Sequence, residues 1–177
     1  VSTFSQGVNR LDLSTGTFEH FGQEQGLTDP RTTKLSIVGN TLWIGTKAGL
    51  FSLSTKTKRI TQVSLGNSVE PYITSLANVE NTYLLAGTQD SGTFAVSANT
   101  ITRLNVPQNV TTYQIRANSA YSITLALGGQ LWHYNLASQQ GEILWQTDDN
   151  VPYIKDFIQT EQGDFWVVGP EAGLIQL

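Results

Sequence analysis

The fold is decided by the stretch LWIGT at residues 42–46, which is followed by GLFSL at residues 49–53. The same pattern recurs as LLAGT with GTFAV between residues 84 and 96, and as FWVVG with GLIQL between residues 165 and 177. Weaker copies are VST with GVNRL between residues 1 and 11, and LALGG with LWHY between residues 125 and 134. The second glycine of each copy lies at position 7, 49, 92, 129 or 173, in steps of 42, 43, 37 and 44 residues. This spacing is the period of a four-stranded β-propeller blade.

A second series of residues, upstream of the apolar segments, repeats with nearly the same period. It consists of Arg31, Tyr72, Tyr113 and Tyr153, spaced by 41, 41 and 40 residues. The two series were chosen independently, so their agreement supports a true structural repeat. We expect repeat units that span approximately residues 1–24, 25–65, 66–106, 107–146 and 147–177.

The segments within a unit differ in polarity, and the difference predicts which strand is buried. Residues 42–46 and 165–168 are continuously apolar, as expected of a middle strand that neighbouring blades cover on both faces. Outer edge strands, which mix polar and apolar side chains, are expected at residues 17–21, 57–63, 100–104 and 142–145. We therefore predict an all-β fold, a β-propeller fragment of about four four-stranded blades that forms part of a larger propeller.

The two ends of the chain both fall inside a blade. A strand count predicts that the chain starts in the second strand of one blade and stops in the third strand of another, so the ends duplicate each other. Two arrangements stay open: a small closed ring, or an open arc that exposes its edge blades to another copy. Methionine is absent even from position 1, so we expect an internal segment of a longer protein.

Composition argues against several classes of partner and site. The formal net charge is -4, and the 10 Lys and Arg residues form no basic face, so we expect no nucleic-acid partner. No apolar run approaches the roughly 20 residues of a membrane span, so this segment is not expected to cross a membrane. The sequence has no cysteine, which excludes disulfides and thiolate metal sites.

The first complete repeat resembles a known family. GLTDPR at residues 26–31, GNTLWIGT at 39–46, GL at 49–50 and TKR at 57–59 are similar to the two-component regulator propeller repeat. This resemblance implies a periplasmic sensor propeller of a bacterial inner-membrane protein, ahead of one membrane helix and a histidine kinase or diguanylate cyclase output domain. None of the output machinery lies in these 177 residues, and function inferred in this way is analogy.

The predicted ligand site is the channel rim, where each innermost strand starts. Candidate rim residues are Arg31, Tyr72, Tyr113 and Tyr153, because tyrosine offers an apolar face and a polar tip. A second set is expected to point into the channel and consists of Lys34, Ser75, Arg116 and Asp156. The alternatives stay open that the tyrosines pack under loops and that the charged residues are merely solvated.

The sequence contains few groups that could converge for catalysis. His20 and His133 are expected in an outer strand and a third strand of different blades, which does not favour a shared metal. Asp148 and Asp149 could bind a cation with Glu171 or Asp156, but their spacing matches no ion-binding loop. We therefore predict no catalytic residue, no metal and no cofactor in this segment.

Three functions compete. The first is a non-catalytic sensory segment that binds a small molecule, a glycan or a peptide. The second is an architectural scaffold that forms a homodimer through its exposed blade edges. The third, which the distant histidines disfavour, is a propeller lyase that uses histidine and a divalent metal.

Overall fold

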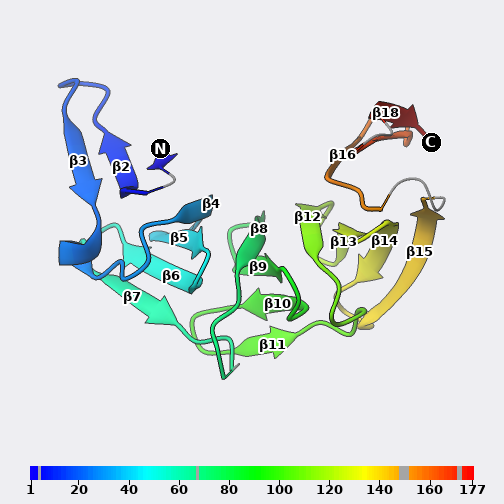
Figure 1. Cartoon of the computed structure of the whole chain (residues 1–177), viewed down its shortest axis with the longest axis horizontal. Helices are drawn as coiled ribbons and strands as arrows, with labels where there is room; N and C mark the ends of the chain where they lie inside the picture. The colour runs from blue at the N-terminus through cyan, green and yellow to red at the C-terminus, as the bar shows by residue number, and fades with distance from the viewer. Residues whose placement is uncertain (4, 67, 148–151, 171–172) are drawn as a thin grey trace.

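The computed structural model of this chain describes residues 1–3, 5–66, 68–147, 152–170 and 173–177. Their regular structure is β-strand apart from one short 3-10 turn, η1 (Gln23–Gln25). The strands form five antiparallel sheets, which follow one another along an open arc (Figure 1). The predicted all-β propeller fold is confirmed, and the arrangement is the open arc rather than the closed ring.

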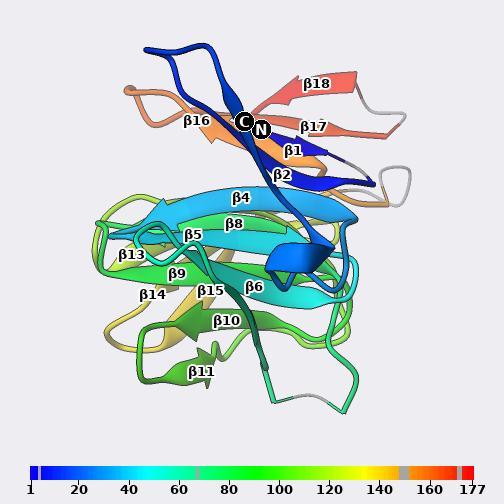
Figure 2. The same ribbon diagram turned by 90° about the vertical axis from the view of Figure 1, so that its left-hand side faces the viewer.

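Three sheets have four strands, which pair in the order in which they follow in the chain. Blade 2 consists of β4 (Thr32–Val38), β5 (Thr41–Thr46), β6 (Gly49–Ser54) and β7 (Ile60–Val63). Blade 3 consists of β8 (Ile73–Val79), β9 (Tyr83–Thr88), β10 (Thr93–Val96) and β11 (Ile101–Arg103). Blade 4 consists of β12 (Thr112–Ala117), β13 (Ser122–Leu127), β14 (Gln130–Asn135) and β15 (Gln140–Gln146). The first strand of each blade lies on the concave side of the arc, and the fourth lies on the convex side (Figures 1 and 2).

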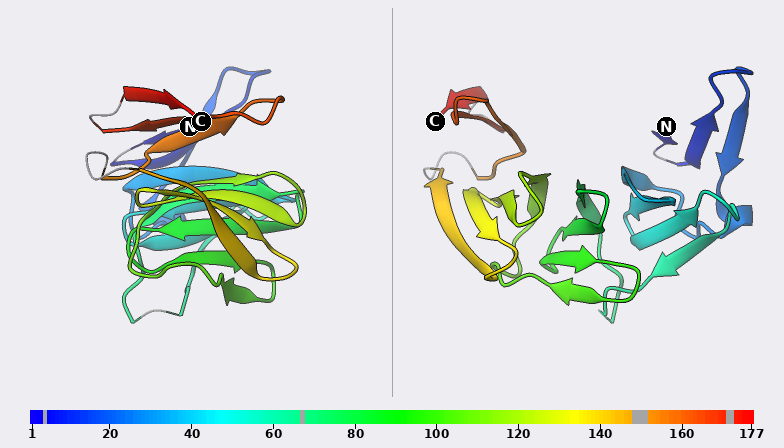
Figure 3. Two further views of the ribbon diagram at one scale, coloured as in Figure 1. Left: turned by 90° about the vertical axis from the view of Figure 1, so that its right-hand side faces the viewer. Right: turned by 180° about the vertical axis from the view of Figure 1, so that it is seen from behind.

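The two end sheets have three strands each. Blade 1 consists of β1 (Ser2–Thr3), β2 (Gly7–Leu11) and β3 (Phe18–Phe21), and blade 5 consists of β16 (Asp156–Gln159), β17 (Phe165–Gly169) and β18 (Gly173–Gln176). As the strand count predicted, blade 1 begins with the equivalent of a second strand and blade 5 ends with a third. Seen from behind, the two end blades stand on opposite sides of the open arc (Figure 3).

The repeated glycine has a conformational reason. Gly49 opens β6 with a φ of 121°, and Gly173 opens β18 with a φ of 64°. Side chains rarely adopt positive φ because Cβ then clashes with the backbone, whereas glycine adopts it freely. The turn between the second and third strands therefore selects glycine.

The hydrophobic core lies between the blades. One cluster of buried residues joins each pair of neighbouring blades; examples are Ile44 with Phe21, Leu50 with Ile73, and Leu131 with Phe157. The apolar strand β5 is covered on both faces, as predicted. The equivalent β17 is not: Val167 is buried against blade 4, but Val168 is 37% exposed, because no described sheet packs beyond blade 5.

The predicted equivalence of Tyr113 with Arg31 and Tyr72 is wrong by two positions. The carbonyl oxygens of Arg31, Tyr72 and Thr111 accept equivalent hydrogen bonds from the residue after the second strand, so Thr111 takes this place in blade 4. The reason is loop length. Eleven residues lie between Ile60 and Tyr72, whereas nine lie between the equivalent Ile101 and Thr111.

The same shift affects the second predicted series. Lys34, Ser75 and Asp156 pair with equivalent residues of their second strands, but in blade 4 that position belongs to Gln114. Arg116 lies two residues further along β12. The residues at equivalent positions of the innermost strands are therefore Lys34, Ser75, Gln114 and Asp156.

Candidate functional site

A bulge marks the start of the innermost strand in each complete blade. The pairing between first and second strands shifts after Thr32, Ile73 and Thr112, so one residue falls outside the ladder. A bulge of this kind redirects a side chain out of the sheet. The bulged residues are Thr33, Thr74 and Tyr113.

These bulged side chains connect each blade to the next. Thr33 Oγ1 donates a hydrogen bond to the Ile73 carbonyl at 2.7 Å, and Thr74 Oγ1 donates one to the Thr112 carbonyl at 2.6 Å. Blade 4 has Tyr113 instead, which stacks on Tyr153 with 4.3 Å between ring centroids and 8° between ring planes. The tyrosine pair thus replaces a hydrogen bond with aromatic packing between blades 4 and 5.

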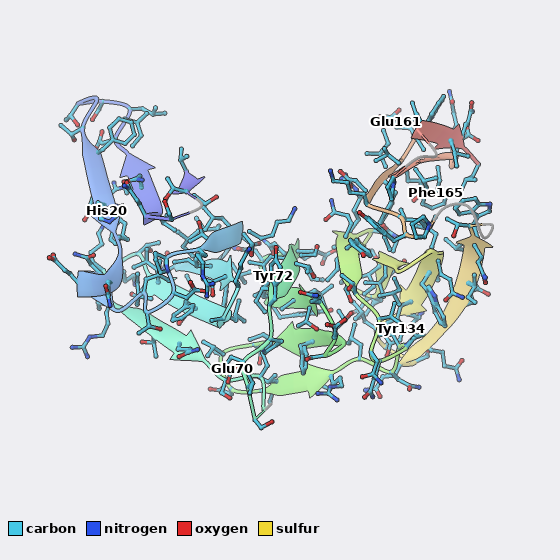
Figure 4. All side chains as sticks on the ribbon, in the orientation of Figure 1. His20, Glu70, Tyr72, Tyr134, Glu161 and Phe165 are labelled. Carbon is cyan, nitrogen blue, oxygen red and sulfur yellow. The ribbon has the colours of Figure 1, made fainter. Side chains whose placement is uncertain are left out.

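A pocket of about 410 Å³ opens where these strands start. It is lined by Lys34, Tyr72, Thr74, Gln89, Thr111, Tyr113 and Lys155, which come from blades 2, 3 and 4 and from the segment leading into blade 5. Figure 4 shows Tyr72 beside β8, near the middle of the arc. The pocket brings together three predicted site residues, Lys34, Tyr72 and Tyr113; we refer to it as the rim pocket.

The rim pocket is positively charged. Lys34 and Lys155 line it, and neither ammonium group has an ion-pair partner within the described residues. Lys47 Nζ lies 5.8 Å from the centroid of the Tyr72 ring, a cation–π distance. Burial raises the pKa of the Tyr113 hydroxyl above its ordinary value, and nearby Tyr153 and Asp90 add to the increase. Tyr113 therefore keeps its proton at neutral pH.

Arg31 lies outside the lining of the rim pocket, in contact with a buried carboxylate. Its Nε donates a hydrogen bond to Asp29 Oδ1 at 2.7 Å, and its backbone amide donates a second one to the same atom. Burial alone would raise the pKa of Asp29, but the side-chain and backbone hydrogen bonds from Arg31 outweigh it and the pKa is lowered. Arg31 and Asp29 thus form a charged pair beside the start of β4.

The other predicted channel residues bond to one another across blades. Ser75 Oγ donates to Gln114 Oε1 at 3.1 Å, and Gln114 Nε2 donates to Asp156 Oδ1 at 2.9 Å. Arg116 Nε donates to the Phe157 carbonyl at 2.7 Å, and Arg116 Nη2 lies 3.6 Å from Asp156 Oδ1. Ser75 is fully buried, so the expectation that it points into the channel is wrong. Arg116 and Asp156 remain about half exposed and neutralise each other.

Sequence reasoning missed four residues of the rim pocket. Thr74, Gln89, Thr111 and Lys155 line it although none was predicted. The repeat carries a signal for two of them: Thr111 becomes visible once the series is corrected by two residues, and Lys155 occupies the place of the bulged Thr33 and Thr74 in blade 5. Gln89 lies in a turn and gives no such signal.

The two histidines do not meet. His20 lies on the outer strand β3 of blade 1 (Figure 4), where Nδ1 is 3.1 Å from Asn9 Oδ1. His133 lies on β14 of blade 4. Within the described residues, no group of three or more acidic or histidine side chains is placed to hold a metal ion. Asp148, Asp149 and Glu171 lie outside the described residues. A search of the described part of the chain for helices long and apolar enough to cross a membrane found none.

Comparison with known proteins identifies similar structures but no family. No protein-family model and no curated protein sequence matches this chain. Among solved structures, the extracellular domain of the hybrid two-component system BT3049 from B. thetaiotaomicron is 22% identical, with a TM-score of 0.76 over 98% of this chain and 24% of that one. The extracellular domain of the hybrid two-component system BT4673 from the same organism is 15% identical, with a TM-score of 0.77 over 99% of this chain and 25% of that one.

A third similar structure belongs to a different class of protein. AFV00434, an ancestral GH74 enzyme, is 11% identical, with a TM-score of 0.73 over 99% of this chain and 29% of that one. The chain thus spans about a quarter of the length of the structures it matches. At such identities the similarity establishes the fold alone, because one fold hosts unrelated functions. The chain is a β-propeller segment.

Proposed function

We propose that this chain is a non-catalytic sensory segment of an extracytoplasmic propeller in a bacterial two-component signalling protein. The supporting observation is the match of nearly the whole chain to extracellular domains of two such systems. The repeat resemblance around residues 26–59 points in the same direction. In this proposal the segment lies in the periplasm, and catalysis belongs to a kinase or cyclase output domain elsewhere in the protein.

The rim pocket is the proposed ligand site. Its volume of about 410 Å³ falls in the range of small-molecule sites. Tyr72 and Tyr113 supply apolar faces, while Thr74 and Gln89 supply hydrogen-bonding groups. Because its lining residues come from several blades, the affinity for a ligand would depend on the relative orientation of those blades.

A reporter strain for the parent signalling protein tests this function. We expect Tyr72→Ala and Tyr113→Ala, alone or together, to reduce the induced reporter response without changing the amount of protein in the membrane. Tyr121→Ala is the matched control, because Tyr121 is 66% exposed and lies outside the rim pocket. An unchanged response in the double variant would contradict the ligand site, and a parent protein without an output domain would contradict the signalling role.

Dimerisation is a second candidate function, favoured by uncovered apolar surface on blade 5. Ile158, Val168 and Leu174 are 51%, 37% and 66% exposed and form one wall of a groove with Trp166. Such a patch suits contact with another protein surface. A further blade of a longer propeller would cover it, and for the 177-residue chain on its own we propose a second copy. Light scattering should then show a dimer that Leu174→Lys dissociates; a strict monomer at high concentration argues against this role.

A further inference from the structure

Basic residues of this acidic chain gather on the concave side. Four of the 10 Lys and Arg residues lie at or beside the starts of the innermost strands: Arg31, Lys34, Lys47 and Lys155. A fifth, Arg116, lies near the end of the innermost strand β12. The chain as a whole has a formal charge of -4, so this distribution opposes the overall charge. A cluster of one sign in a concave surface raises the local potential and attracts ions of the opposite sign.

Part of this charge is already compensated within the protein. Arg31 pairs with Asp29, and Arg116 lies 3.6 Å from Asp156 while it also donates to a backbone carbonyl. Lys34 and Lys155 differ, because neither has an ion-pair partner within the described residues. Lys34 and Lys155 thus bring to the rim pocket positive charge that no ion pair among the described residues compensates.

The remaining lining of the rim pocket offers no competing anion. It consists of Tyr72, Thr74, Gln89, Thr111 and Tyr113, none of which is an acidic residue. Asp90 is the described carboxylate that acts on Tyr113, but it does not line the pocket. A ligand carboxylate, sulfate or phosphate would thus meet two ammonium groups together with hydroxyl and amide donors.

From these observations we infer that the rim pocket binds a small anion that carries at least two negative charges and a ring. The two lysines, one from blade 2 and one from the segment before blade 5, recognise the charges. The tyrosine faces pack against the ring, since aromatic side chains stack on flat or cyclic groups. This inference rests on the proposed ligand site and adds the chemical class of its ligand.

Calorimetry with two matched probes tests the inference on the 177-residue chain. Benzene-1,3,5-tricarboxylate has three charges, and benzene-1,3,5-tricarboxamide has the same shape without charge. We expect the tricarboxylate to bind more tightly, and its affinity to fall as ionic strength rises. Lys34→Ala and Lys155→Ala should each weaken it by about fivefold, the upper range for an exposed ion pair.

Controls separate this inference from the proposed function. Lys56→Ala removes the same charge from an exposed turn between β6 and β7 and should leave affinity unchanged. Equal binding of both probes, or no effect of the two lysine variants, would overturn the anionic class. Absence of binding by either probe also overturns it, whereas the reporter response of the tyrosine variants decides the proposed function independently.

Discussion

The second and third strands of blade 2 and of blade 5 have the same sequence pattern but lie in different surroundings. Leu50 of blade 2 and Leu174 of blade 5 occupy equivalent positions, as do Gly45 and Val168. Leu50 is completely buried against blade 3, whereas Leu174 is 66% exposed. The comparison shows that this position is buried by the following blade and not by its own sheet.

The largest difference in stability is expected between the alanine variants of Leu50 and Leu174. Leu50→Ala should lower the free energy of unfolding by about 2–5 kcal/mol, because it leaves a cavity between blades 2 and 3. Leu174→Ala should change it by less than about 0.5 kcal/mol, because water already contacts this side chain. Chemical denaturation of both variants measures the difference. Equal costs would indicate that another molecule covers blade 5 in solution.

At the position of Gly45 and Val168, the informative substitution of Gly45 adds a methyl group instead of removing side-chain atoms. A Cβ on Gly45 would lie 2.7 Å from Ile73 Cγ2 and 3.0 Å from Ile73 Cβ, so the next blade approaches too closely for a side chain. Gly45→Ala should therefore destabilise the chain by about 1–3 kcal/mol through overpacking. The equivalent Val168 faces the open groove, and Val168→Ala should have an effect below about 0.5 kcal/mol. A harmless Gly45→Ala would mean that the blades separate readily.

Blade 3 fills the leucine position differently. Thr93, the equivalent of Leu50, is fully buried, and its Oγ1 lies 2.9 Å from Oγ1 of the buried Thr112 in blade 4. Thr93→Val should cost about 1–3 kcal/mol because it leaves the Thr112 hydroxyl buried without a partner. The double change to valine should recover most of this loss. Two additive single effects in this double-mutant cycle would show that the two hydroxyls do not interact.

Much of the fold could be predicted because each repeat carries its own turn and strand chemistry. Gly49 and Gly173 mark the same turn in different blades, and Trp43 and Trp166 mark the same strand position. The sequence could not show that Trp166 lines an open groove while Trp43 is buried, because the difference depends on whether another blade follows. Burial of the tryptophan side chain at this position therefore depends on the neighbouring blade.

The candidate site was harder to predict for a related reason. Tyr113 and Lys34 were assigned to the rim and do line the pocket, but Tyr113 reaches it from a bulge rather than from the predicted repeat position. Loop lengths vary from blade to blade, so a series counted along the chain drifts from the spatial alignment. Lys155 shares the repeat position of the bulged Thr33 and Thr74, but Gln89 lies in a turn and no repeat position marks it as a lining residue.

The smallest expected effect is on acid stability at the start of blade 2. The folded-state pKa of Asp29 lies below its ordinary value, so Asp29 stabilises the fold above that ordinary value, and the contribution disappears as pH falls through the lowered pKa. Arg31→Ala keeps the backbone hydrogen bond to Asp29 but removes the side-chain hydrogen bond and the positive charge, so the pKa should rise and acid unfolding should begin at a higher pH. Circular dichroism during acid titration measures this midpoint.

The control for this pair is an exposed ion pair in blade 1. Arg10 lies 3.2 Å from Glu19 Oε2, and both side chains are about half exposed. Arg10→Ala should leave the acid midpoint unchanged, because water screens the pair and Lys58 also contacts Glu19. If both variants move the midpoint equally, net charge explains the effect. If only Arg31→Ala shifts the midpoint, the shift is due to the burial of Asp29. The buried and the exposed ion pair would then differ in their effect on stability, as the buried Leu50 and the exposed Leu174 do.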